Sequence, residues 1–266
     1  SILKNRKTRL GMKITILGSG TSQGVPRVGG KLNNGWGLCD PSNPKNRRRR
    51  VSIMVEHGDT RLIVDTGPDL REQCLSADII WLNAVLYTHD HADHTHGIDD
   101  LRAIAQNMKI DVPVYGNKHT LDVLKRRFDY IFKNRKGYPS ICTAHEIDTA
   151  PFKIGDIDVQ PIELIHGGII TYGFRFGNVC YCTDFNDIPS HSDQLLEGLD
   201  VWIVDCLREE PHPTHCHLEQ TLGYVDKYKP KHTILTHMTA EMDYETLRIK
   251  LPNGVEPAYD GMVISI

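Results

Sequence analysis

The sequence lacks long hydrophobic runs, and this absence excludes a helical membrane protein. None of its apolar stretches approaches the roughly 20 residues that a membrane-spanning helix needs. The beginning of the chain also lacks an apolar stretch and carries several basic residues instead, which is not the pattern of a secretory signal peptide. We therefore expect residues 1–11 to be a flexible extension, ordered structure to begin at Met12, and the protein to be cytoplasmic.

The composition shows no disulfide framework and no excess of basic charge. Seven cysteines at irregular spacing fit a reduced cytosol better than a set of paired disulfides. The net charge of -3 argues against a general basic footprint, so we expect no extended nucleic-acid surface. The chain has 266 residues, of which 39% are hydrophobic, so it can bury a sizeable core without disulfides.

Hydrophobic periodicity indicates strands and helices that are mixed along the chain. Val51, Ile53 and Val55 alternate as a half-buried strand requires, whereas residues 99–108 carry apolar side chains at helical spacing. Neither a repeat nor a linker divides the sequence, so it predicts one α/β domain over residues 12–266. Strands are expected at residues 12–17, 51–55, 61–64, 84–87, 112–115, 157–164, 171–176, 179–182, 201–204, 233–235 and 262–266. Helices are expected at residues 99–108, 121–132, 218–228 and 244–251.

Two segments near the first strands follow neither periodicity. Residues 24–44 are rich in glycine, asparagine and proline, which predicts a long loop, and loops of this length are usually functional or disordered. Residues 47–50 are four consecutive arginines. Two interpretations of this run stay open: it binds the phosphate of a substrate or of a nucleic-acid backbone, or it is the solvated flank of the loop.

The segment Thr-His-Asp-His-Ala-Asp-His at residues 88–94 carries the strongest chemical signal. It follows an apolar strand and precedes a helix. His89 and His91 point the same way in an extended chain, and the turn into the helix can bring Asp93 and His94 towards the same point. Packing does not explain three imidazoles and a carboxylate so close together, so we predict a metal site. Such a set suits zinc, while manganese and iron stay open because N and O donors are mixed.

The pattern His-x-His-x-Asp-His resembles the signature of the metallo-β-lactamase superfamily. The rest of the chain is similar to that superfamily in the same order, because further acidic or histidine residues follow apolar strands at Asp65, His166, Asp184 and His237. The resemblance covers residues 12–266. It implies the α/β fold class and, within it, a four-layer αββα sandwich.

The resemblance also implies a set of ligands for two divalent metal ions, zinc or manganese. One ion would take His89, His91 and His166, the other Asp93, His94 and His237, and Asp184 would bridge the two. Asp65 would support the ligands from behind. Two such ions lower the pKa of a water molecule between them and hold both the attacking and the leaving oxygen of a displacement.

Other segments resemble one subfamily, the cyclic-phosphate phosphodiesterases of bacterial phosphonate degradation. The likeness lies at residues 17–26, 47–52, 214–215 and 259–262. That subfamily often has a structural zinc site, built from cysteines in the first loop and a histidine three residues after the last ligand. Here the loop holds only Cys39 and the histidine position is Ala240, so both halves of the site are missing. The loop therefore needs another anchor.

Residues 212–217 form a second segment that is dense in histidine. A third zinc site is conceivable there, but the spacing matches no usual zinc finger, and a catalytic loop is the preferred interpretation. His215 matches the catalytic histidine that the resemblance implies, and an ordinary histidine pKa near 6.5 suits a general acid at neutral pH. His212, His217 and Asp93 stay open for that role, so Asp93 is a candidate catalytic residue as well as a ligand.

These patterns together predict an enzyme, a dinuclear metal-dependent hydrolase that cleaves a small or cyclic phosphate ester or a nucleotide. Its expected partners are that small molecule and a second copy of the chain in a homodimer. A tRNA-processing nuclease and a thioesterase of the same fold are the alternatives. An alternative of another class is a non-catalytic nucleotide- or metal-binding protein, and the complete set of ligands argues against it.

Overall fold

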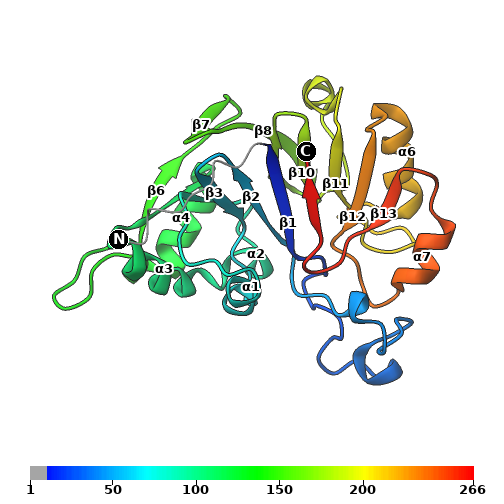
Figure 1. Cartoon of the computed structure of the whole chain (residues 1–266), viewed down its shortest axis with the longest axis horizontal. Helices are drawn as coiled ribbons and strands as arrows, with labels where there is room; N and C mark the ends of the chain where they lie inside the picture. Colours follow the sequence, from blue (N-terminus) through cyan, green and yellow to red (C-terminus); the bar gives the residue numbers. More distant parts are fainter. Residues whose placement is uncertain (1–10) are drawn as a thin grey trace.

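The computed structural model describes residues 11–266, and two β-sheets of seven strands each form its centre (Figure 1). The strands of the first sheet are β1 (Met12–Gly18), β2 (Ser52–His57), β3 (Thr60–Val64), β4 (Ala84–Leu86), β5 (Val112–Gly116), β6 (Cys142–Glu146) and β14 (Val263–Ser265). Those of the second are β7 (Phe152–Ile154), β8 (Ile157–His166), β9 (Ile169–Phe176), β10 (Val179–Cys182), β11 (Val201–Asp205), β12 (His232–Thr236) and β13 (Val255–Pro257).

Both sheets are mixed, with an antiparallel half and a parallel half. The first has the order β14–β1–β2–β3–β4–β5–β6 and is parallel from β3 to β6. The second has the order β13–β12–β11–β10–β9–β8–β7 and is parallel from β10 to β13. The helices are α1 (Leu70–Ser76), α2 (Ala92–Thr95), α3 (Leu101–Met108), α4 (Lys118–Arg127), α5 (Asp129–Phe132), α6 (Leu218–Tyr228) and α7 (Tyr244–Lys250).

Alternation along β2 shows how the side chains divide into layers. Ile53 and Val55 belong to a core that also contains Phe174 of the second sheet. Met54, between them, faces the other way and packs in a separate core with Leu101 of α3. Because side chains of a strand alternate between faces, one short segment can serve both layers.

Helices cover the outer faces of the two sheets, as Figure 1 shows. Leu70 of α1 and Leu121 of α4 pack on the first sheet, whereas Tyr228 of α6 and Leu247 of α7 pack with the second. This arrangement confirms the predicted α/β fold class and its four-layer αββα sandwich.

The local differences from prediction have identifiable causes. The helix expected at residues 121–132 is two helices, because Phe128 leaves the helical region with φ -128° and ψ 45°. Helix α4 also starts earlier than expected, at a turn where the Asn117 side chain accepts a hydrogen bond from the backbone N–H of Thr120. Strand β6 was not predicted, since only its first residue, Cys142, is buried and the strand lacks the usual alternation.

Several expectations about the whole chain stay predictions. The flexible extension lies, apart from Gly11, outside the described residues. One domain over residues 12–266 is supported by the core that both sheets share. The cytoplasmic location and the homodimer are likewise still predictions. Within residues 11–266, none of the helices has the length and apolar character to span a membrane.

A row of three charged side chains crosses the antiparallel half of the first sheet. Lys13, Glu56 and Arg61 occupy paired positions on β1, β2 and β3. Glu56 is buried, with its Oε2 2.5 Å from Lys13 Nζ and its Oε1 2.8 Å from Arg61 Nη2. Burial raises the pKa of the Glu56 carboxyl, but the hydrogen bonds from both cations outweigh burial and hold the pKa below its usual value.

We expect Glu56→Gln to lower the free energy of unfolding at pH 7 by about 1–3 kcal/mol, because charge-assisted hydrogen bonds in a buried position are lost. Because the pKa of Glu56 is lower in the folded than in the unfolded protein, ionised Glu56 stabilises the fold at any pH above its unfolded-state pKa. This contribution is lost as the pH falls through its folded-state pKa. The difference between wild type and variant should therefore shrink below about pH 4. Urea unfolding at a series of pH values measures it.

Glu72→Gln is the matched control, since Glu72 pairs with Arg71 on the surface. Its effect should stay within about 0.5 kcal/mol at any pH. Equal effects of the two substitutions would contradict a special role for the buried row.

Candidate metal centre

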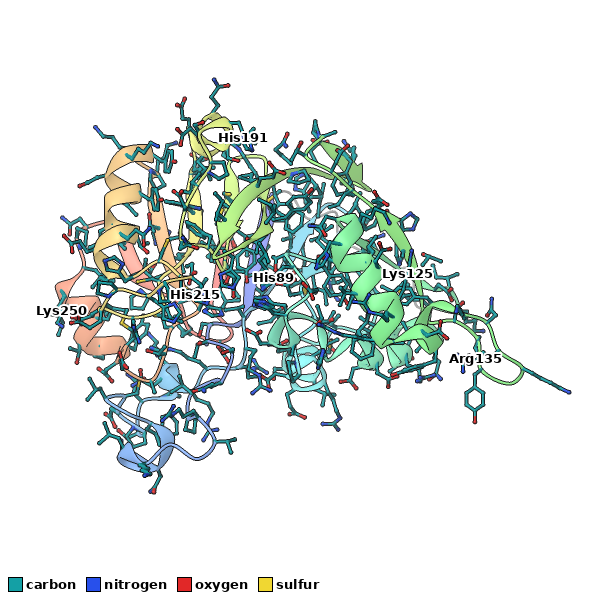
Figure 2. The ribbon with its side chains drawn as sticks, turned by 180° about the vertical axis from the view of Figure 1, so that it is seen from behind. His89, Lys125, Arg135, His191, His215 and Lys250 are labelled. Atoms are coloured by element: carbon teal, nitrogen blue, oxygen red, sulfur yellow. The ribbon has the colours of Figure 1, made fainter. Side chains whose placement is uncertain are left out.

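The histidine-rich segment lies where the chain passes from β4 into α2. His91 still has extended backbone, with φ -61° and ψ 151°, and α2 begins at the next residue. The turn brings the imidazoles together: the ring centroid of His89 lies 4.4 Å from that of His91 and 4.3 Å from that of His94. His89 and His94 are buried, whereas His91 is exposed. Figure 2 shows His89 in the middle of the molecule, between its two halves.

Three polar residues at strand ends have left-handed backbone, which is uncommon for residues other than glycine. They are Asp65 after β3, Asp184 after β10 and His237 after β12, with φ values of 66°, 56° and 61°. Such conformations carry strain and gather at functional sites. Here they turn three strand ends from both sheets towards the same edge of the sandwich, where the histidine-rich segment lies.

Two groups of ligand-type side chains meet at Asp184. One group is His89, His91 and His166, the other is Asp93, His94 and His237, and Asp184 belongs to both. Its Oδ1 lies 3.1 Å from His94 Nε2 and 3.3 Å from His237 Nε2. Its Oδ2 lies 3.9 Å from His89 Nε2 and 3.9 Å from His166 Nε2. Each oxygen of a single carboxylate therefore faces one group.

Hydrogen bonds at their Nδ1 atoms orient two of the imidazoles. His94 Nδ1 lies 2.7 Å from Asp65 Oδ2, and His166 Nδ1 lies 2.6 Å from the carbonyl oxygen of Thr214. Histidines that bind metals are oriented in this way. Within the described part of the chain, Nε2 of His89 and Nε2 of His94 are buried without a hydrogen-bond partner. Buried nitrogens of this kind need a partner, and a divalent cation fits them.

The charges of the centre also favour a cation. Burial lowers the pKa of His94, but the carboxylates of Asp184, Asp93 and Asp65 outweigh burial and raise the pKa well above its usual value. Burial raises the pKa of Asp184, yet the imidazoles of His237 and His94 hold that pKa well below its usual range. The carboxylates of Asp93 and Asp184, whose pKa values are lowered, therefore stay ionised and stabilise positive charge at the point where the Nε2 atoms converge.

Asp205, the last residue of β11, was not predicted from the sequence. It is buried, accepts the backbone N–H of Phe185, and its Oδ2 lies 2.9 Å from His215 Nδ1. This contact orients His215 so that its Nε2 lies 3.9 Å from Asp184 Oδ2. Burial lowers the pKa of His215, but Asp205 outweighs burial and raises the pKa to about 9. The signal that could have identified Asp205 is an aspartate at the end of an apolar strand, close to the position that Asp65 occupies after β3.

Of the histidines at residues 212–217, His215 alone belongs to a group of converging ligand atoms among the described residues, together with Asp205 and His237. Figure 2 shows His215 close to His89 in the middle of the molecule, whereas His191 lies at the periphery. His212 lies next to His215, with ring centroids 5.3 Å apart. A separate zinc site built from this segment is therefore not supported.

The four arginines at residues 47–50 are engaged by protein groups. Arg47 lies over the Trp36 ring, Arg48 is buried, and Arg49 and Arg50 form ion pairs with Asp260 and Asp69. The run is therefore at least partly structural, and its binding of a phosphate stays a prediction. The sequence does not reveal the ion-pair partners of such an arginine run when those partners are far away along the chain.

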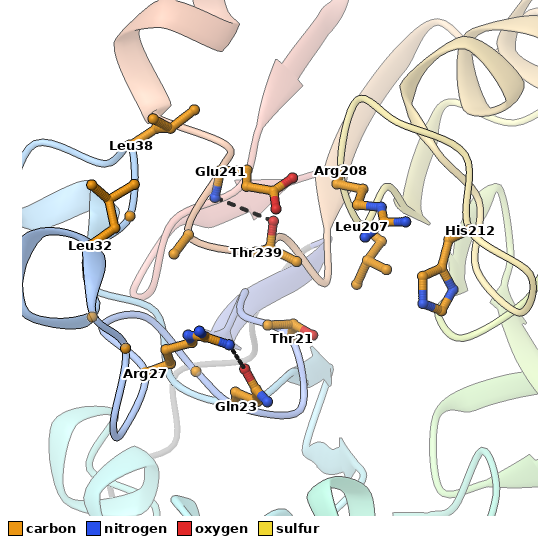
Figure 3. A pocket seen from close by; sticks show the side chains of 15 residues that line it. Thr21, Gln23, Arg27, Leu32, Leu38, Leu207, Arg208, His212, Thr239 and Glu241 are labelled. Carbon is orange, nitrogen blue, oxygen red and sulfur yellow. Dashed lines mark hydrogen bonds between the residues drawn. The ribbon is translucent and has the colours of Figure 1, made fainter.

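A cavity of about 440 Å³ has His212 in its lining (Figure 3), and the His212 ring lies 5.3 Å from the ring of His215. The loop before β2 forms one wall, with Arg27 and Leu32. The segments after β11 and β12 form the other walls, with Arg208, His212, Thr239 and Glu241. Both cationic and apolar side chains line it, so an anionic molecule with an organic substituent fits its chemistry.

Comparisons with known proteins agree with this geometry. Residues 60–238 match the model of the beta-lactamase superfamily domain. The crystal structure of a diphosphatase from the PhnP family is similar along the whole chain, with 37% sequence identity and a TM-score of 0.89. The superposition covers 97% of this chain and 98% of that one.

Two further relatives are similar over part of their length. An octanoyltransferase of Porphyromonas gingivalis is 32% identical over 257 residues, which are 94% of this chain and 51% of that protein. A ribonuclease Z of a Bradyrhizobium species is 34% identical over 89 residues, which are 32% of this chain and 30% of that protein. The chain thus spans about half of the first relative, and the match to the second is shorter still.

Proposed function

We propose that this chain, which belongs to the metallo-β-lactamase superfamily, hydrolyses a small phosphodiester with the help of two divalent metal ions. Its fold and its clusters of histidine and aspartate make it a hydrolase, and the fold implies divalent metal ions. The number of ions, the roles of the residues and the phosphodiester substrate belong to the proposal.

The observation that carries the proposal is the shared carboxylate of Asp184. One oxygen lies near His94 and His237 and the other near His89 and His166. A carboxylate that faces two sets of nitrogen donors suits two cations held close together, and a single ion would leave one set unused. The distance between two ions in such sites is roughly 3.5–4 Å, which suits displacement at phosphorus.

The proposed ligands divide between the ions as the groups do. One ion would be held by His89, His91 and His166, the other by Asp93, His94 and His237, with Asp184 between them. The mixture of nitrogen and oxygen donors suits zinc or manganese. When bound, the two ions supply an activated water nucleophile and stabilise charge on the attacking and leaving oxygens.

His215 is the proposed general acid, and Asp205 positions it. The contact from Asp205 to Nδ1 leaves Nε2 directed to the centre, and the Asp205 carboxylate stabilises the protonated imidazole. That proton would be donated to the oxygen of the leaving alcohol. Asp93 is a poorer acid, because the neighbouring imidazoles of His94 and His237 outweigh its burial and lower the pKa of its carboxyl.

The relatives and the cavity support a small phosphate ester as substrate. The similar diphosphatase and ribonuclease Z are named for reactions at phosphorus, and Arg27 and Arg208 line the cavity that His212 also lines. Octanoyl transfer, for which the longer relative is named, has no support in this centre, where two groups of ligands surround one carboxylate. A nucleic acid is the second candidate substrate, because of the similar ribonuclease Z.

A panel of substrates tests the proposal. With Zn²⁺ or Mn²⁺ added, we expect turnover of bis(p-nitrophenyl) phosphate and of small nucleotide diesters to exceed turnover of a thioester, a β-lactam and a single-stranded oligonucleotide. Removal of metal with a chelator should abolish the activity, and added metal should restore it. Faster cleavage of the oligonucleotide would favour the nuclease, and absence of any metal-dependent turnover would contradict hydrolysis by this centre.

Loss of Asp184 should damage the centre more than loss of any ligand that belongs to one group. Asp184→Ala removes oxygen donors from both groups, so we expect both ions to be lost and the activity to fall by more than the roughly 10–100-fold that removing an outer-shell partner costs. His91→Ala, the control, should cost about one ion. Elemental analysis of protein purified without chelator measures the ions.

The same analysis counts the ions in the wild type, where two are expected. The first loop holds one cysteine, and Ala240 stands where a further histidine would be needed for a structural zinc site. A third, tightly held zinc ion, or an Asp184→Ala variant that keeps both ions and near-normal turnover, would contradict this assignment.

The role of His215 can be separated from binding by the choice of leaving group. His215→Ala should lower turnover of an alkyl diester by about 10²–10⁴-fold, because the alkoxide needs a proton. The loss should be smaller for a p-nitrophenyl diester, whose leaving group needs little protonation. His212→Ala is the matched control and should show no such dependence. Equal losses on both esters would leave His215 a binding role, and loss of metal would make it a ligand.

A further inference from the structure

The loop that forms one wall of the cavity has little core of its own. Between β1 and β2 it contains only short 3-10 turns; Val28, Leu32 and Leu38 are mostly exposed, and its buried apolar side chains include Val25 and Cys39. Figure 1 shows this blue segment at the lower edge of the molecule, away from the stacked sheets. A wall with so few buried apolar contacts needs specific bonds to keep its shape.

The side chain of Arg48 supplies such bonds from a fully buried position. Its Nη1 donates to the carbonyl oxygen of Thr239 at 3.0 Å, and its Nη2 donates to that of Met242 at 2.5 Å. On the loop side, Nη2 lies 3.4 Å from Asn46 Oδ1 and Nη1 lies 3.6 Å from Cys39 Sγ. The guanidinium therefore bonds at once to the loop and to the segment that follows β12.

The backbone of Arg48 connects a third segment. Its N–H donates to the carbonyl oxygen of Val25, and its carbonyl oxygen accepts the N–H of Val25, both at 2.9 Å. Val25 begins the stretch that carries Arg27 and Leu32 along the cavity. One residue thus joins both ends of the loop to the opposite wall.

Neighbouring contacts follow the same direction. Asn46 Nδ2 donates to Asp243 Oδ1 at 2.7 Å, and the N–H of Leu38 donates to the carbonyl oxygen of Ala240 at 2.8 Å. Gly37 has φ 58°, and a Cβ there would lie 2.5 Å from the same carbonyl oxygen. The loop and the segment 239–243 therefore pack backbone against backbone, and this close packing restricts movement of the loop relative to that segment.

We propose that Arg48 is a positioning residue that fixes the shape of the cavity and so determines which phosphodiesters are accepted. The inference rests on the proposed function. The planar fork of a guanidinium can reach two carbonyl oxygens and two loop atoms together, whereas an ammonium is a single point of donation. An apolar side chain of similar length would remove the donor that Arg48 gives to the carbonyl oxygen of Met242, and would leave that of Thr239 with only the N–H of Met242.

The effect of an Arg48 substitution on turnover should depend on how far a substrate extends from the metal centre. The walls that Arg48 connects carry Arg27 and Leu32 on one side and Thr239 and Glu241 on the other. A small ester group contacts only the centre, but a large one must fit between the walls. A shift of about 1 Å in such groups can cost up to 10²-fold in rate.

The test uses two diesters with the same leaving group, methyl p-nitrophenyl phosphate and thymidine 5′-(p-nitrophenyl phosphate). Wild type, Arg48→Lys and Arg48→Met are compared with both. Arg61→Met is the matched control, because Arg61 is also a largely buried arginine but pairs with Glu56 in the first sheet. Metal content and thermal unfolding are measured for every variant.

We expect Arg48→Met to lower kcat/KM for the thymidine ester about 10–100-fold more than for the methyl ester, mainly through KM. The ratio of kcat/KM for the two esters in Arg48→Lys should lie between the ratios of wild type and Arg48→Met. If Arg48→Met does not fold, Arg48→Lys alone tests the proposal. Arg61→Met should lower stability without changing the ratio of the two esters. Equal losses on both esters in the Arg48 variants, with metal retained, would overturn the proposal.

Limited trypsin digestion gives a readout without turnover. Arg27 and Lys31 are exposed in the loop. We expect the rate of cleavage after these residues to be lowest in the wild type, higher in Arg48→Lys and highest in Arg48→Met. Unchanged cleavage in both variants would overturn the anchor. If the wild type hydrolyses neither ester, the proposed function fails, and digestion still shows whether Arg48 holds the loop.

Discussion

The structure depends on keeping ionised carboxylates and imidazoles together in a buried position at one edge of two sheets. Burial by itself disfavours an ionised carboxylate, and the imidazoles around Asp184 reverse that preference. The groups come from the ends of β3, β4, β8, β10, β11 and β12. The site therefore exists only when both sheets have packed on their shared core, and the large apolar core between them serves to bring these strand ends into register.

Much of the fold could be predicted because most strands and helices have a recognisable hydrophobic periodicity in their own sequence. The alternation at Ile53 and Val55 and the helical spacing before Met108 agree with β2 and α3, but β2 is buried on both faces, whereas the sequence predicted a half-buried strand from Val51. The elements that were missed are short or weakly patterned, as in β6, where exposed residues dominate. Periodicity reports burial of a repeating face, so a strand at the edge of a sheet gives little signal.

The centre was predictable to different degrees for different residues. The segment from His89 to His94 indicates a metal site by spacing alone, whereas His166, Asp184 and His237 are far apart along the chain and needed the resemblance to a family. Asp205 was missed although it ends an apolar strand, because its contact with His215, ten residues away through a loop, leaves no periodic pattern in the sequence. The ion pairs of the arginine run could not be predicted for a similar reason, because the partners Asp69 and Asp260 lie far away along the chain.

The buried guanidinium of Arg48 also explains how the loop can do without a structural zinc site. A zinc site would require ligating side chains on both segments, whereas Arg48 bonds to carbonyl oxygens, which every residue possesses. The anchor therefore tolerates Ala240 and depends instead on the course of the backbone after β12. That course is set at Met238, whose N–H donates to the carbonyl oxygen of Ser19 and whose carbonyl oxygen accepts the N–H of Thr21. His237 immediately precedes this point. The same short segment therefore carries a candidate ligand at one end and the carbonyl oxygens that accept from Arg48 at the other.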